Sequence, residues 1–217
     1  LMVDLPRTKA SLRQFTLNAT QNAKPLLQAA LARELQVDWS KGAEAVPESM
    51  LDVTLTQLDL AQWQALAGPE VRAGVLSGKL GLNVQKAGRL VAFDLASQLT
   101  NLSAELATNQ VVGLSLTLGT RGTVAEFNQV NVVGDLQVNQ LLVRDPAVKR
   151  THPPQDARLK WDALFNQGVL ELRQAQLTLT PTERARNQLQ LAGRVDLSQS
   201  NAITGHLKLA AESLDLT

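Results

Sequence analysis

Apolar and polar residues alternate with a period of two over most of this chain. Phe15 and Leu17 flank Thr16, and the same pattern returns in many short runs up to Leu207 and Leu209. Such alternation places the apolar side chains of a strand on one face and the polar side chains on the other. The sequence therefore predicts a mainly β protein, built as an elongated, curved antiparallel sheet with one wet face.

Turn signals separate these runs at short intervals. Residues 86–88 and 166–168 each end in glycine between two alternating runs, and they predict hairpins. Residues 181–187 predict a longer loop. Residues 145–156 contain three prolines and several charges, which predicts an internal loop or a break in the sheet.

One segment near the N-terminus shows helical spacing instead. In residues 25–36, Leu27, Leu31 and Leu35 share one stripe of a helix. Pro25 suits the first position of a helix, because its missing N–H is not needed there. We expect a short helix over this segment.

A second short helix is predicted over residues 61–67. Asp59 is a candidate cap before it, and Gly68 is a candidate stop after it. The rest of the chain is predicted to be β.

A weak repeat runs through the β segments. The pattern apolar, any, Gly, any, apolar, any, apolar occurs at 76–82, 132–138, 191–197 and 203–209, around Gly78, Gly134, Gly193 and Gly205. A glycine inside an alternating strand indicates a bulge, a bend or a close backbone approach. The spacing between copies is irregular, which excludes a strict solenoid.

The chain of 217 residues is interpreted as one elongated β-rich segment, residues 1–217. It begins with Leu, and both ends have strand-like sequence, so we expect it to be a piece of a longer protein. No run of 18 apolar residues is present, and any membrane anchor or targeting signal is expected outside this segment.

Composition excludes several functions. Aromatic residues are only 3% of the chain, which disfavours the Tyr- and Trp-rich sites of many enzymes and interfaces. The net charge of +1, with acids and bases intermixed, gives no footprint for nucleic acid and no polybasic patch. Cysteine is absent, which excludes thiol catalysis, cysteine zinc sites and disulfides.

No residue set predicts catalysis. No nucleophile elbow, P-loop, dinucleotide fingerprint or zinc-protease motif is present. The only two histidines, His152 and His206, lie far apart in the sequence, and a solvated role is expected for both. Four aspartates at polar positions are expected on a solvated face: Asp52, Asp59, Asp94 and Asp135. We therefore expect no enzyme activity, no catalytic residue, no metal site and no cofactor.

The three tryptophans, Trp39, Trp63 and Trp161, allow two readings. Each could face a lipid, but an anchor in the core is the commoner role for this residue.

One part of the sequence resembles a known family. The run Leu58-Asp59-Leu60, followed by Trp63 and then by the Gly-x-Leu-x-Gly-x-Leu-x-Leu strand at 74–82, resembles the AsmA/TamB-like proteins of bacterial envelopes. The resemblance covers residues 53–217 and has no counterpart for the helix expected at 25–36. It implies a repeating β-groove with an apolar inner face, in a periplasmic body anchored to the inner membrane. It also implies a role in phospholipid transport between membranes or in outer-membrane assembly.

The apolar strand face is the candidate site. A phospholipid or another acyl-chain lipid is the expected partner, with envelope assembly proteins as further candidates. The alternative is a structural or interaction module, such as a sandwich, a β-helix-like scaffold or an adhesin segment, whose apolar face is a closed core. The predicted lipid-binding residues are Val53, Leu55, Leu80, Leu82, Val84, Val91, Phe93, Leu95, Leu114, Leu116, Leu118, Leu136, Val138, Leu177, Leu179, Leu207 and Leu209.

Overall fold

The computed structural model describes residues 3–4, 9–38, 48–86, 89–106, 109–144, 153–198 and 203–215. Nearly all of these residues lie in strands, which confirms the mainly β prediction. The elements are β1 (Val3–Asp4), β2 (Lys9–Leu12), β3 (Thr16–Gln21), β4 (Lys24–Arg33), β5 (Leu35–Asp38), β6 (Ser49–Asp59), α1 (Gln64–Ala67), β7 (Val71–Gln85), β8 (Leu90–Leu106), β9 (Asn109–Ala125), β10 (Gln129–Arg144), β11 (Gln155–Asn166), β12 (Val169–Leu179), β13 (Gln188–Asp196) and β14 (Thr204–Glu212).

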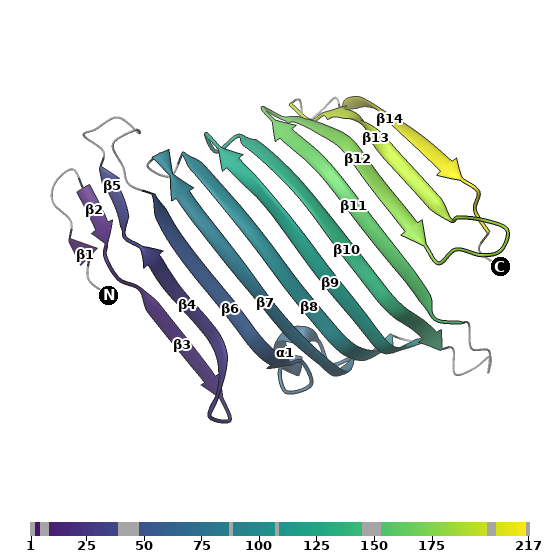
Figure 1. Cartoon of the computed structure of the whole chain (residues 1–217), viewed down its shortest axis with the longest axis horizontal. Coiled ribbons are helices and arrows are strands. Elements are labelled where there is room, and N and C mark those ends of the chain that lie inside the picture. The colour runs from purple at the N-terminus through teal and green to yellow at the C-terminus, as the bar shows by residue number, and fades with distance from the viewer. Residues whose placement is uncertain are drawn as a thin grey trace.

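Eleven strands form one open antiparallel sheet, in the order β14-β13-β12-β11-β10-β9-β8-β7-β6-β4-β3 (Figure 1). From β6 to β14 each strand pairs with the next one along the chain, which makes this part a simple meander. The three short strands β1, β2 and β5 form a separate small sheet, seen in Figure 1 beside the β3–β4 end. The large sheet therefore has two edges, β3 and β14.

A line of irregularities bends the strands β6 to β10. The residues Leu58, Leu76, Leu99, Leu116 and Val138 are successive partners across these strands. Beside this row the register shifts in β6, β7, β8 and β10, and in β9 Gly113 has a φ of 69°. A bulge bends its strand and increases the local twist. Because the bulges are aligned, the strands bend together, which explains the curvature of the sheet.

The sheet is a single layer with little buried core. Among the described residues only five apolar side chains are buried, and no large side chain is completely enclosed. The five are Leu26, Ala29, Val111, Leu114 and Ala185. Most apolar strand residues are instead half-buried, shielded by their neighbours on the same face.

The helix expected at 25–36 is wrong, because this segment forms β4 and β5. Leu27, Ala29 and Leu31 also satisfy a period of two, and β4 pairs on both sides, with β3 and with β6. Two ladders of backbone hydrogen bonds outweigh the weak helical preference of a Leu- and Ala-rich segment. Pro25 lies at the start of β4, beside a register shift, where a strand tolerates a missing N–H.

The second predicted helix is confirmed, although it begins later and is only four residues long. The backbone N–H of Ala61 donates to Oδ1 of Asp59 at 3.0 Å, so Asp59 caps the turn that precedes α1. Gly68 ends the helix with a φ of 100°.

The turns agree with the sequence where the structure describes them. Gln167 and Gly168, with φ values of 49° and 83°, make the tight hairpin between β11 and β12. Residues 181–187 form the longer loop between β12 and β13. Residues 87–88 and 145–152 lie outside the described residues, but β7 pairs with β8 and β10 pairs with β11.

Candidate functional site

The strand register brings all of the predicted lipid-binding residues to one side of the sheet. Partners opposite each other in neighbouring strands share a face. Val53 is opposite Leu80, Leu80 is opposite Leu95, and this row continues across the sheet to Leu209. Parallel rows contain the other predicted residues. We call this surface the apolar face, and the opposite surface the polar face.

The apolar face is broad and carries few polar groups. Eleven strands spaced about 4.8 Å apart make it roughly 50 Å wide across the strands. Within its five rows in β6 to β14, the polar side chains are those of Ser49, Ser97 and Thr120. Thr120 directs its Oγ1 to the backbone carbonyl of Val133 at 3.0 Å, so its hydroxyl donor is satisfied within the sheet.

No second sheet or helix layer among the described residues covers the apolar face. Leu114 is buried near the line of bulges, and the other predicted residues are half-buried except at the β14 edge. There Leu207 and Leu209 are 57% and 66% exposed. The apolar face therefore has the amino-acid composition of a buried core, although its side chains are mostly half-buried and some are exposed.

Two aromatic rings lie across glycines on the apolar face. A Cβ added at Gly134 would lie 2.0 Å from Cζ2 of Trp161, and one added at Gly122 would lie 2.8 Å from Cζ of Phe93. Each ring thus occupies the space that a side chain on the neighbouring strand would need. The two rings lie near the middle of the sheet, Trp161 over Gly134 of β10 and Phe93 over Gly122 of β9.

Trp63 has a different role. Trp63 immediately precedes α1, and its Nε1–H donates to Oε1 of Gln21 at 3.3 Å, which ties the α1 segment to the β3–β4 hairpin. Trp39 lies outside the described residues.

The repeated glycines allow close backbone approach, which is one of the three roles that the sequence indicated for them. A Cβ at Gly193 would lie 2.2 Å from the carbonyl oxygen of His206, and one at Gly205 would lie 2.6 Å from that of Arg194. Gly193 also has a φ of 154°, which favours glycine. Gly78, Gly134, Gly193 and Gly205 all lie on the apolar face.

The polar face carries the candidate carboxylates. Asp52, Asp94 and Asp135 lie on it, as does His206, opposite Arg194. Nε of Arg158 donates to the carboxylate of Asp135 at 2.9 and 3.1 Å. This hydrogen-bonded guanidinium lowers the pKa of Asp135 and keeps its carboxylate charged. His152 lies outside the described residues.

A shallow hollow of about 440 Å³ lies over the middle of the sheet, with Asp94, Gly119, Arg121, Asp135 and Lys160 among its lining residues. Its charges are of both signs, and Asp135 is already engaged by Arg158. In the described part of the chain, no group of three or more acidic or histidine side chains could hold a metal ion. None of the described helices has the length and apolarity needed to cross a membrane.

Sequence reasoning missed part of the apolar face. Leu27, Ala29 and Leu31 of β4 belong to it, because β4 pairs in register with β6. Trp161 and its neighbour Leu159 on β11 also belong to it. The period-two signal was present at all these positions, but helical spacing hid it in β4.

Comparison with known proteins gives no relative. The chain matches no protein-family model, no curated protein and no solved structure. Functional inference therefore depends on the apolar face itself.

Proposed function

We propose that this chain is a non-enzymatic, lipid-binding β-groove segment of a cell-envelope protein. The observation that carries the proposal is the apolar face, which is continuous over the large sheet and has no covering layer among the described residues. Soluble proteins seldom expose contiguous apolar patches of this extent, and such patches mark sites for partners, ligands or membranes.

Acyl chains fit this surface energetically. Burial of one methylene contributes about 0.8 kcal/mol, so a chain of about a dozen carbons gains on the order of 10 kcal/mol before entropy costs. This gain requires no specific polar contact. Contact with lipid would also remove the apolar face from water, which the single-layer fold does not do by itself.

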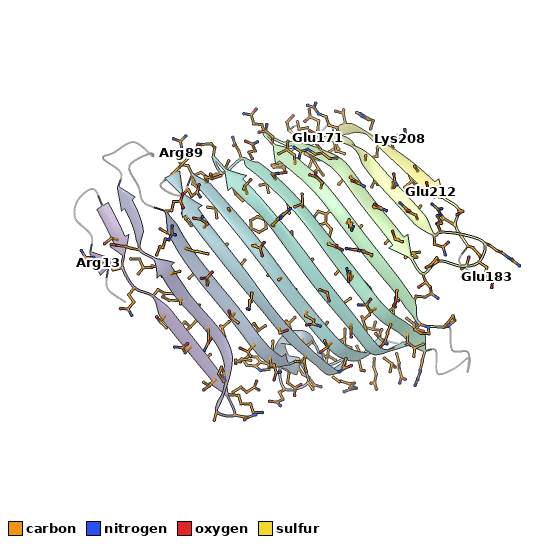
Figure 2. The ribbon with its side chains drawn as sticks, in the orientation of Figure 1. Arg13, Arg89, Glu171, Glu183, Lys208 and Glu212 are labelled. Carbon is orange, nitrogen blue, oxygen red and sulfur yellow. The ribbon has the colours of Figure 1, made fainter. Side chains whose placement is uncertain are left out.

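The rims of the sheet suit the boundary between an acyl chain and water. Ion pairs flank the strand ends, Arg72 with Glu105 at one end and Arg89 with Glu126 at the other. Figure 2 shows Arg89 and Glu171 along one rim and Glu183 beyond the other. A lipid could place its chains on the apolar face and its headgroup among these solvated charges.

The AsmA/TamB-like resemblance supports the same role. The Leu58-Asp59-Leu60 segment ends β6, and the glycine-rich run at 74–82 lies in β7, so the two parts of the motif form neighbouring antiparallel strands. Membership of this family would place the chain in the periplasm, within a protein anchored to the inner membrane. Its function would be phospholipid transport between membranes or outer-membrane assembly, together with envelope proteins.

The test is native mass spectrometry of the chain purified from a bacterial host, with lipid extraction alongside. Copurified phospholipid that survives gel filtration is expected. Leu116→Asp places a charge on the apolar face of β9 and should reduce the bound lipid at least about tenfold, since an unpaired charge against an acyl chain is costly. Thr117→Asp is the matched control, because Thr117 is the next residue, exposed on the polar face.

Equal lipid content in Leu116→Asp and Thr117→Asp would place the lipid elsewhere and contradict the proposed site. A stable, lipid-free wild-type chain would contradict lipid binding itself. That result would favour the structural-module alternative, in which another protein layer covers the apolar face.

A further inference from the structure

A small pocket of about 270 Å³ lies between the β3–β4 hairpin and the turn that precedes α1. Figure 1 shows this hairpin and α1 at the same end of the sheet. Asp59 and Val75 of its lining are partners, one position along from the Leu58–Leu76 pair. Because successive side chains of a strand point to opposite faces, Asp59 and Val75 lie on the side away from the apolar face. The pocket is therefore separate from the proposed lipid surface.

A chain of side-chain hydrogen bonds holds the polar wall of this pocket in place. Nε1–H of Trp63 donates to Oε1 of Gln21 at 3.3 Å, and Nε2 of Gln21 donates to Oε1 of Gln62 at 2.6 Å. Nε2 of Gln62 donates in turn to Oδ2 of Asp59 at 2.9 Å, and Oδ1 of Asp59 accepts from the backbone of Ala61. Each of the two amides is held at both ends, so the wall needs little reordering to receive a ligand.

The same wall keeps hydrogen-bonding capacity for a ligand. The amides of Gln21 and Gln62 each use only one of their two N–H donors within the pocket. The side chain of Gln57 makes no hydrogen bond to a described residue, and Lys24 makes no ion pair with one. The pocket thus offers amide donors and acceptors, together with one ammonium and one carboxylate group.

The floor of the pocket is apolar. Leu26 is only 7% exposed, and Pro25 and Val75 also line the pocket. An apolar surface with a few oriented polar groups is the usual composition of a small-molecule site. The volume lies just below the range of roughly 300–1,000 Å³ typical of drug-sized ligands, so it suits a ligand of about one ring.

We propose that this pocket binds a neutral, hydroxyl-rich ligand, a single sugar unit of a saccharide. A hydroxyl group both donates and accepts hydrogen bonds, as the amides of Gln21, Gln57 and Gln62 do. The C–H groups of the sugar ring lie on the apolar floor. The charges of Lys24 and Asp59 balance, so the lining has no net charge that would favour an ion. Sugar binding at this pocket goes beyond lipid binding and does not require it.

Saturation-transfer NMR of the wild-type chain tests the class of ligand, with glucose and N-acetylglucosamine as the probes. Binding of at least one of the two sugars is expected, without displacement by inorganic phosphate. Failure of both sugars to bind at any accessible concentration would overturn the proposal. Displacement of the bound sugar by phosphate would overturn the neutral ligand class.

Substitutions test the location of the site. Gln57→Ala removes an amide and should weaken sugar binding at least about tenfold, since a hydrogen bond to the ligand is lost. Gln28→Ala is the matched control, because Gln28 is an exposed glutamine of β4 that does not line the pocket. Val75→Phe should abolish binding, because the larger side chain fills the pocket.

Urea unfolding of each variant checks that the fold is intact. Gln57→Ala and Gln28→Ala should both keep the wild-type midpoint, since both side chains are exposed and neither bonds to a described residue. Equal sugar affinity of these two variants would place the ligand elsewhere and overturn the site. Binding that survives in a folded Val75→Phe variant would overturn it as well.

Discussion

Trp161 and Gly134 show how one pair of residues shapes the apolar face. The indole ring occupies the position that a Cβ at residue 134 would take. A ring lying flat across a glycine buries aromatic surface in a sheet that has no second layer to cover it. Part of the packing that a second sheet would supply is thus obtained within one layer.

Gly134→Ala should therefore displace Trp161 and destabilise the protein by about 1–3 kcal/mol, the usual cost of overpacking. The measurements are urea unfolding and tryptophan fluorescence, which should shift to the red as the ring becomes exposed. Gly119→Ala is the matched control on β9, because its Cβ would meet nothing within 4 Å. It should be neutral or stabilising by up to about 1 kcal/mol. Equal effects of the two substitutions would show that the ring does not depend on Gly134.

The Asp135–Arg158 pair gives a pH prediction. Arg158 lowers the pKa of Asp135 in the folded state, so the pair contributes stability at neutral pH that is lost as pH falls through this lowered pKa. The stability difference between wild type and Asp135→Asn should thus shrink below about pH 4. The effect should be small and salt-sensitive, since both side chains are open to solvent.

Urea unfolding from neutral to acid pH measures this difference. Asp94→Asn is the control on the same face, because Asp94 makes no ion pair with a described residue. A difference between wild type and Asp135→Asn that stays constant down to the most acid pH would contradict the argument.

Among the elements, the aligned bulges determine the shape of the sheet. At its place in this line, Gly113 of β9 has a φ of 69°, a conformation that β-branched residues rarely adopt. A Cβ there would meet no neighbour, so any cost of substitution arises from the backbone.

Gly113→Val should destabilise the protein by about 1–2 kcal/mol, the cost of a left-handed conformation for an L-residue. Gly113→Asn should cost less, because asparagine tolerates this conformation. Asn101 on the neighbouring strand already has a φ of 54°. The urea concentrations at the unfolding midpoints of the two variants measure this difference. Equal midpoints would mean that the backbone at residue 113 adopts another conformation in the valine variant at no extra cost.

The sequence predicts most of the strands, because apolar and polar residues alternate wherever one face of the sheet is exposed to solvent. It fails at β4, where Leu27, Leu31 and Leu35 fit both a helix and a strand. Pairing with β3 and β6 makes this segment a strand. The spacing of apolar residues within the segment does not show which other strands will pair with it. The sequence marks only some of the bulges. Gly113 is a glycine within a strand, which indicates an irregularity, whereas Gln140 has a positive φ at its bulge and no distinctive residue type.

At the scale of the whole molecule, the sequence located the apolar face but not its exposure. Leu80 and Leu116 need only be apolar, whether a second sheet or an acyl chain covers them. The number of layers depends on topology, and a meander of neighbouring pairs gives one layer. The candidate residues could therefore be predicted as a face, while the lack of a covering layer among the described residues follows only from the topology.

The meander has a consequence for how such a protein changes size. Because β8 and β9 contact mainly the strands beside them, removal of this hairpin would bring β7 next to β10, again antiparallel. A duplicated hairpin would widen the sheet by about 10 Å and keep both faces in phase. Evolution could therefore change the width of the apolar face in steps of one two-stranded hairpin, without changing the packing of a core.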